Sequence, residues 1–197
     1  IEGKAQATGL DEDSADAVGG EAMLTMQGDK GKAAILDEAR RTLAPGGRYA
    51  IHELALTPDD IDAATKDEIR LAMSKSIRVN ARPLTVAEWR RLHEDHGFVV
   101  EQIRTAEMGL LKPSQLIDDE GPAGVARIVG NMIKLPAARR RVLGMRKVFV
   151  EHGDALASIG IVARSPGRSD IAGDGQSARN ATPRRPDIEF LDEGQKA

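Results

Sequence analysis

The 197-residue chain contains no cysteine. This absence excludes disulfides, cysteine-ligated zinc and a thiol nucleophile. No apolar stretch is as long as a membrane span requires, and no signal-peptide pattern is visible. The net charge is only −3, which does not favour binding to nucleic acid or to an anionic membrane. We therefore predict a cytoplasmic protein whose partners include neither a nucleic acid nor a membrane.

Several catalytic motifs are also absent from the sequence. It has no H-E-x-x-H metal-ligand pair, no G-x-S-x-G nucleophile elbow and no P-loop. We therefore predict no metal site. The composition is ordinary, with 41% hydrophobic and 30% charged residues, and the chain is long enough for one domain with a sizeable core.

The clearest local pattern lies in residues 32–54. Apolar residues recur there at helical spacing, at Ala34, Ile35, Ala39 and Leu43. The run Pro45-Gly46-Gly47 is predicted to end this helix, because proline lacks an N–H donor and glycine tolerates positive φ. Residues 49–51 are then predicted to form a short strand.

Further elements follow the same alternation of helix and strand. Thr57-Pro58-Asp59-Asp60 predicts the start of a helix that runs to about Ile77. Thr85 and Glu88 have capping-box spacing, which predicts a second helix ending at Gly97. The other predicted elements are strands at 15–20, 98–103 and 156–163, and helices within 113–152 that are broken near Gly121-Pro122 and Pro136. This order favours an α/β sheet with helices on both faces.

Five segments resemble class I S-adenosylmethionine-dependent methyltransferases, in the same order along the chain. Residues 43–48, Leu-Ala-Pro-Gly-Gly-Arg, resemble the L-K-P-G-G-x run before the family's fifth strand. Residues 1–5 resemble V-x-G-D-A after the third strand, and residues 13–18 resemble D-x-S-F-D-x-V before the fourth. Residues 82–98 resemble the helix that leads to the sixth strand, and residues 156–164 resemble the antiparallel seventh strand.

The resemblance implies a Rossmann-like methyltransferase sheet, mostly parallel with an antiparallel last strand, formed by residues 1–164. Residues 165–197, rich in Gly, Pro, Ser, Asp and Arg, are predicted to be a disordered tail. The family's G-x-G-x-G loop, which cradles the cofactor, does not occur in the sequence. Three strand–helix units would take about 90 residues, at roughly 30 per unit. We therefore expect Ile1 to be a cut that removes the N-terminal half.

The resemblance also implies S-adenosylmethionine as cofactor. Lys4 stands where the family has an acid for the adenine amine, while Ala5 offers a backbone amide and Gln6 a side-chain acceptor. A backbone carbonyl near Gly20 matches the position that meets the ammonium group of the cofactor. The residues implied to bind the cofactor are Lys4, Ala5, Gln6, Gly20, Glu21 and Ala22.

The candidate substrate residues follow from position in the predicted sheet. His52 and Glu53 end the fifth strand of the family, where open α/β sheets bind ligands, and a general base there assists a hydroxyl nucleophile. They are the predicted catalytic residues, although an ordinary polar strand end is the alternative. Arg82 can bind an anionic substrate, or be an exposed loop arginine. Met108 can line an apolar substrate pocket, or fill the core.

Three functional hypotheses remain open on the sequence alone. The first is methyl transfer from S-adenosylmethionine to a small-molecule acceptor in the intact enzyme, this chain alone being inactive. The second is a non-catalytic methyltransferase scaffold that serves as a partner or regulatory subunit. Such a scaffold would form a homodimer or pair with the N-terminal half that we expect to be missing, because a half-sheet exposes a strand edge. The third, a nucleotide-binding oxidoreductase half, predicts binding of a nicotinamide cofactor.

Overall fold

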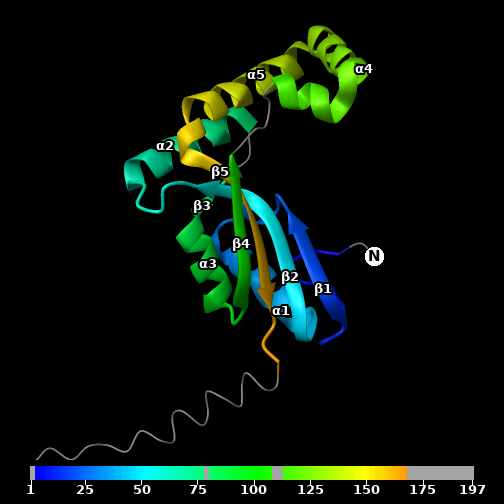
Figure 1. Cartoon of the computed structure of the whole chain (residues 1–197), viewed down its shortest axis with the longest axis vertical. Coiled ribbons are helices and arrows are strands. Elements are labelled where there is room, and N and C mark those ends of the chain that lie inside the picture. The colour runs from blue at the N-terminus through cyan, green and yellow to red at the C-terminus, as the bar shows by residue number, and fades with distance from the viewer. Residues whose placement is uncertain (1–2, 78–79, 108–112, 168–197) are drawn as a thin grey trace, which may run out of the picture. The chain divides into compact units, whose positions relative to one another are not determined.

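The computed structural model describes residues 3–77, 80–107 and 113–167. A mixed sheet forms the centre of this part of the chain (Figure 1). β1 and β2 are parallel, whereas β5 is antiparallel to both of its neighbours, β2 and β4. The predicted sheet with an antiparallel last strand is therefore confirmed. In spatial order the strands are β1 (Ala15–Glu21), β2 (Leu43–Leu56), β5 (Leu156–Arg164) and β4 (Val99–Glu107), and the short β3 (Leu84–Thr85) pairs with the end of β2.

The run Pro45-Gly46-Gly47 lies inside a strand rather than between a helix and a strand. The helix α1 (Asp29–Thr42) ends three residues before Pro45, near the predicted position, but β2 begins at once with Leu43, which was predicted to belong to the helix, and is much longer than expected. The strand continues through the glycines because Ser165 donates its N–H to the Gly47 carbonyl at 2.8 Å and accepts one from Gly46 at 3.0 Å. A Cβ at position 47 would lie 2.9 Å from the Ala44 carbonyl oxygen and 3.1 Å from that of Asp16. Glycine is therefore required here for close backbone packing.

Two helices follow β2 along the chain. α3 (Val86–Asp95) has the predicted capping box: the Glu88 N–H donates to Thr85 Oγ1 at 3.2 Å, and the Thr85 N–H donates to the Glu88 carboxylate at 2.8 Å. α2 (Ala63–Ile77) begins later than predicted. The Asp62 side chain accepts the N–H of Thr65 at 3.0 Å, so this aspartate caps the helix, which does not start at Thr57-Pro58-Asp59-Asp60 as predicted.

The last two helices lie between β4 and β5 in sequence. α4 (Pro113–Lys134) is kinked at Gly121, where φ is 66°, and α5 (Pro136–Glu151) begins at Pro136. Both breaks are at the predicted positions. A single turn of 3₁₀ helix, η2 (Gly153–Ala155), then leads into β5. Among the residues that the structure describes, no helix combines the length and apolarity that crossing a bilayer demands.

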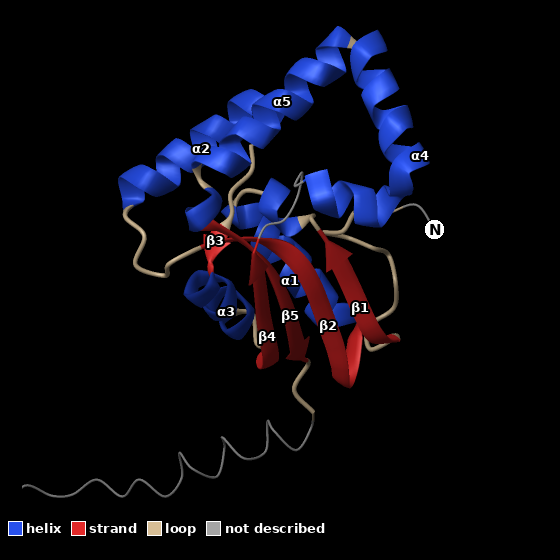
Figure 2. Cartoon of the chain, turned by 45° about the horizontal axis from the view of Figure 1, so that its top comes forward, coloured by secondary structure: helices blue, strands red, loops and turns tan. Residues whose placement is uncertain are grey.

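The helices pack on the sheet in two groups. α1 and α3 lie against one face (Figure 2), where Trp89, Tyr49 and Ile159 belong to the larger cluster of buried apolar side chains. α2 and α5 lie side by side beyond the carboxyl end of β2 and enclose a smaller cluster. On the opposite face of β1 and β2, Ala17 and Ala50 are exposed. Except for Met108, which lies outside the described residues, the functional residues predicted from the sequence lie near the carboxyl end of β1, on the neighbouring part of β2 and in the segments that flank them.

Candidate functional site at the carboxyl ends of β1 and β2

The chain leaves β1 through a short turn that is held by a buried carboxylate. This turn includes the 3₁₀ helix η1 (Leu24–Met26). One oxygen of Glu53 accepts the N–H groups of Met23 at 2.8 Å and Leu24 at 2.6 Å. The other accepts the N–H of Thr25 at 3.1 Å and its hydroxyl at 2.6 Å. A carboxylate here satisfies the N–H groups that a helix start leaves free.

These bonds determine what Glu53 can do. Its side chain is only 3% exposed, and both oxygens are occupied by donors from residues 23–25. The structure therefore places this predicted catalytic residue inside the protein, where it positions the turn after β1. No local sequence signal indicates this role, because the bonded residues are 28–30 positions away.

Glu21 ends β1 and is the register partner of His52, which lies four residues before the end of β2. His52 Nδ1 lies 3.6 Å from Glu21 Oε1, and both side chains are mostly exposed. The Ala22 N–H donates to the His52 carbonyl at 2.8 Å, and Ala22 adopts a positive φ of 49°. With Nδ1 facing a carboxylate, the histidine can keep Nε2 available to accept a proton. His52 is therefore the best general-base candidate at this edge.

Gly20 lies next to this pair and above a buried tyrosine. A Cβ at position 20 would lie 3.6 Å from the Tyr49 hydroxyl oxygen, which is ordinary contact. The pKa of Tyr49 is raised, first by burial and then by the negative charge of Glu53. Tyr49 is therefore protonated at neutral pH and is not a candidate base. Among the described residues, no cluster of His, Asp and Glu has the arrangement of a metal site.

A lysine is buried beside the same turn. Lys32, on α1, is 1% exposed; its Nζ donates to the Gln27 carbonyl at 2.8 Å and lies 6.0 Å from the centre of the Trp89 ring. The pKa of Lys32 is lowered chiefly by burial, with Arg82 and Arg70 adding to that effect while Asp29 and Glu53 oppose it. No pattern in the sequence predicts this burial, because a lysine at this position is typical of a surface helix.

The predicted adenine loop precedes β1. Lys4 and Gln6 are exposed, and the Ala7 N–H donates to the Lys4 carbonyl at 2.9 Å in a tight turn. Ala5 is partly buried against the larger core cluster. Lys4 and Gln6 are thus accessible to a ligand, and Ala5 attaches the loop to the core.

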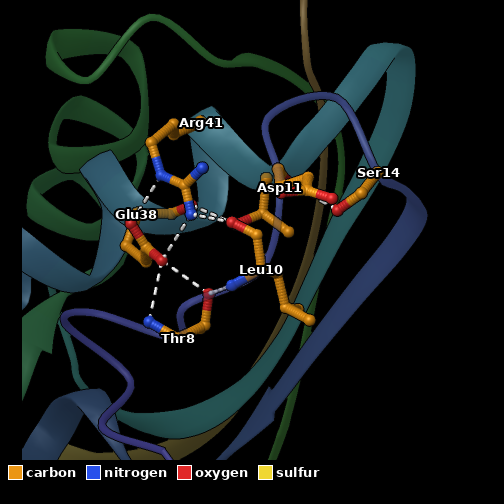
Figure 3. Close-up of polar contacts among 7 residues, drawn as sticks. Thr8, Leu10, Asp11, Ser14, Glu38 and Arg41 are labelled. Atoms are coloured by element: carbon orange, nitrogen blue, oxygen red, sulfur yellow. Dashed lines mark hydrogen bonds and ion pairs between the residues drawn. The ribbon is translucent and has the colours of Figure 1, made fainter.

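The segment after this loop is fixed to α1 by an ion-pair network (Figure 3). Glu38 accepts the N–H of Thr8 and the guanidinium of Arg41, each at 2.8 Å, and Arg41 also donates to the Leu10 carbonyl at 2.7 Å. Hydrogen bonds from Arg41, and then from Thr8, hold the pKa of Glu38 well below its usual value. This network fixes the segment that leads into β1, and no local pattern predicts it because its partners are 30 and 31 residues apart.

Of the two residues predicted to bind substrate, Arg82 and Met108, the structure describes only Arg82. The Arg82 N–H donates to the Thr25 carbonyl at 2.7 Å, so its backbone is attached to the Glu53-bound turn. Its guanidinium is 41% exposed and lies 4.0 Å from the Asp29 carboxylate. Met108 lies outside the residues that the structure describes.

Comparison with known proteins supports the fold. No family model matches the chain. An uncharacterised Haemophilus influenzae protein is 33% identical over 125 residues, which are 64% of this chain and 48% of that protein. The chain therefore spans about half the length of this curated relative.

Two solved structures show which fold this is. A candidate sarcosine dimethylglycine methyltransferase from Galdieria sulphuraria matches with a TM-score of 0.59 at 19% identity, over 83% of this chain and 58% of that one. A geranyl diphosphate methyltransferase in complex with GPP and sinefungin matches with a TM-score of 0.57 at 15% identity, over 82% of this chain and 50% of that one. The chain thus has the Rossmann-like fold of class I methyltransferases.

Proposed function

We propose that this chain is part of an S-adenosylmethionine-dependent methyltransferase that acts on a small-molecule acceptor. The observation that carries the proposal is the arrangement at the carboxyl ends of β1 and β2. There Glu21 and His52 lie 3.6 Å apart beside a turn that Glu53 holds with four hydrogen bonds. In open α/β sheets ligands bind at this edge, and the structural neighbours named above are methyltransferases.

The residues at this edge fit one side of the cofactor. Gly20 and Ala22 offer backbone groups beside an exposed carboxylate, that of Glu21, and a side chain at Gly19 would meet nothing within 4 Å. When bound, S-adenosylmethionine supplies a methyl group on a positively charged sulfur. Glu21 would favour that positive charge, and Ala5 and Gln6 would meet the adenine as the resemblance implies.

His52 is the group that would handle the proton of the acceptor. Its Nε2 would accept a proton from a hydroxyl as the nucleophile attacks, and Glu21 would stabilise the imidazolium that forms. Glu53 and Arg82 would keep the neighbouring turn in place, so that acceptor and methyl group stay aligned. Alignment is the main contribution that a protein makes to such a displacement.

A non-catalytic scaffold is the second candidate function. The sequence has no G-x-G-x-G loop, and Lys4 stands in place of the acid. β1 has a single neighbour among the described strands, and Ala17 and Gly19 on its open face are exposed. An unpaired edge of this kind favours association with another chain, either a second copy or the glycine-loop half that the resemblance implies.

Calorimetric titration with S-adenosylhomocysteine separates the two candidates. If the chain takes part in cofactor binding, we expect a saturable heat of binding. Glu21→Gln should then weaken the affinity for S-adenosylhomocysteine by about tenfold, which corresponds to the loss of one charge contact of roughly 1.4 kcal/mol. Asp16→Asn is the matched control, because Asp16 is another exposed acid on β1. No heat from a folded chain, together with a dimer in light scattering, would instead favour the scaffold.

A further inference from the structure

Exposed apolar side chains gather on the last two helices, α4 and α5. Residues 113–151 are about a quarter of the residues that the structure describes, yet they carry six of the ten large apolar side chains that are exposed there. These six are Ile117, Val129, Ile133, Leu135, Leu143 and Val150. α5 packs on α2 and α4 packs on α5, away from the sheet (Figure 1). A concentration of exposed apolar surface marks a place where another molecule binds.

One side of α5 forms an open hollow with positive charge beside it. The hollow is lined by Leu143, Arg146, Lys147 and Val150, which follow one another at the spacing of a single helix face. Leu143 is 45% exposed and Val150 is 71% exposed. Val148, by contrast, is buried in the smaller apolar cluster that α5 shares with α2. The face that bears the hollow is therefore free for contact with another molecule.

A surface of opposite charge lies on the first part of α4, before the kink at Gly121. Ile117 is 49% exposed there, and Asp118 and Glu120 beside it are exposed as well. No basic residue occurs in positions 113–120. The start of α4 thus presents an apolar side chain among negative charges, whereas the hollow of α5 presents apolar side chains among positive charges.

The two surfaces also match in length, and their charges are not used within one chain. Residues 113–120 span about 12 Å of helix, and the hollow from position 143 to position 150 spans about 10.5 Å, at roughly 1.5 Å per residue. Asp118, Glu120 and Arg146 form no ion pair with any side chain that the structure describes, and Lys147 pairs with the exposed Glu151 at 3.5 Å. An exposed pair of this kind contributes little and exchanges readily.

We propose that the chain forms a homodimer in which the start of α4 in each copy binds the hollow of α5 in the other copy. Ile117 enters the hollow between its two apolar ends, and the two acids beside it meet the two cations. Each copy presents both surfaces, so a two-fold axis produces the contact twice and closes the assembly. This interface is separate from the open edge of β1, and it does not depend on the methyltransferase proposal.

Sedimentation equilibrium of the full chain over a range of protein concentrations measures the dimer. Arg146→Glu and Lys147→Glu, made together, reverse the charge of the hollow. Asp118→Lys and Glu120→Lys, made together, reverse the charge of the start of α4. Each double variant should weaken the dimer by at least about tenfold, because every attraction that becomes a repulsion occurs twice in a two-fold dimer. Raising the salt concentration should weaken the unchanged dimer.

Mixing the two double variants provides the critical test. In the mixed dimer the reversed hollow of one copy meets the reversed α4 of the other, and the two unchanged surfaces also match each other. The affinity of the mixed dimer should therefore return to nearly that of the unchanged chain, although each variant alone dimerises weakly. A merely structural effect of the substitutions would not be reversed by mixing.

The matched controls are reversals of equally exposed neighbours on α3. Arg90→Glu with Arg91→Glu changes the net charge as much as the reversal of the hollow does, and Glu94→Lys with Asp95→Lys does the same for the acids. Neither control pair lies on α4 or α5, so both should leave the dimer unchanged. Circular dichroism shows that each variant is folded.

Three results would overturn the proposal. The first is a chain that stays monomeric at every concentration tested. The second is a dimer that neither reversal weakens, which would assign the contact to another surface such as the edge of β1, or a loss that mixing does not restore. The third is a monomer that binds vesicles of phosphatidylcholine and phosphatidylserine and loses this binding in Arg146→Glu with Lys147→Glu, which would assign the hollow to an anionic membrane.

Discussion

Removing the Glu53 carboxylate should destabilise the protein severely, because four donors at the end of β1 depend on it. Glu53→Ala leaves the N–H groups of residues 23–25 and the Thr25 hydroxyl without their acceptor in a region where Leu24 and Thr25 are buried. A hydrogen bond to a charged group contributes about 1.5–3 kcal/mol, and an unsatisfied buried group costs about 1–3 kcal/mol. Since the turn can relax and water can enter, the four losses will not add fully.

We therefore expect Glu53→Ala to lower the free energy of unfolding by about 3–5 kcal/mol, near the upper end of what single substitutions do. At about 2–4 °C per kcal/mol for a chain of this size, the melting temperature should fall by about 6–20 °C. Glu53→Gln keeps one acceptor oxygen and should lower the free energy of unfolding by about half as much as Glu53→Ala does. Urea unfolding followed by circular dichroism measures both. A change below about 0.5 kcal/mol in Glu53→Ala would refute the positioning role, as would a loss in His52→Ala equal to that in Glu53→Ala.

The remaining stability predictions concern pH and a glycine. The pKa of His93 is lowered from 6.5, chiefly by burial. The unfolded chain therefore binds the extra proton, and the stability should fall as pH drops below about 6.5. Urea midpoints should show this fall, and His93→Phe should abolish it. The pKa of Glu38 lies well below 4.5, so a further loss should begin below pH about 4.5 and be absent in Glu38→Gln. Gly47→Ala should lower the free energy of unfolding by about 1–3 kcal/mol, because the added methyl group would crowd backbone oxygens. The methyl group of Gly19→Ala would have no atom within 4 Å, so the melting temperature of this variant should be unchanged.

Local patterns predicted the elements of the fold well. The capping box at Thr85 and Glu88, the helix break at Pro136 and the end of α1 before Pro45 were all confirmed, because each depends on residues a few positions apart. The predicted start of α2 was wrong, since two capping residues, Thr57 and Asp62, lie close together in the sequence and it is the Asp62 side chain that caps the helix. The length of β2 was underestimated because pairing with β5 extends it through the glycines.

The site was less predictable, because its interactions link distant parts of the chain. The sequence placed both His52 and Glu53 at the end of a strand, whereas β2 continues to Leu56; His52 is exposed beside Glu21, and Glu53 is buried. Side chains alternate between the two faces of a strand. The apolar Tyr49 and Ile51 share the face of Glu53, so this alternation indicates that Glu53 points inward and His52 outward. What the sequence does not show is that residues 23–25 supply the hydrogen bonds of the buried carboxylate.

This alternation also gives the two residues complementary roles. Glu53 points inward and fixes the turn, and the turn in turn holds the backbones next to His52 and Arg82 through two hydrogen bonds of 2.8 and 2.7 Å. A buried carboxylate therefore fixes the backbone beside a candidate base without touching a ligand. If that is its function, Glu53→Gln should weaken the binding of S-adenosylhomocysteine although Glu21 and His52 are intact, and it should do so at temperatures well below its own unfolding transition. Unchanged affinity in the folded variant would mean that β1 and β2 position Glu21 and His52 independently of the turn.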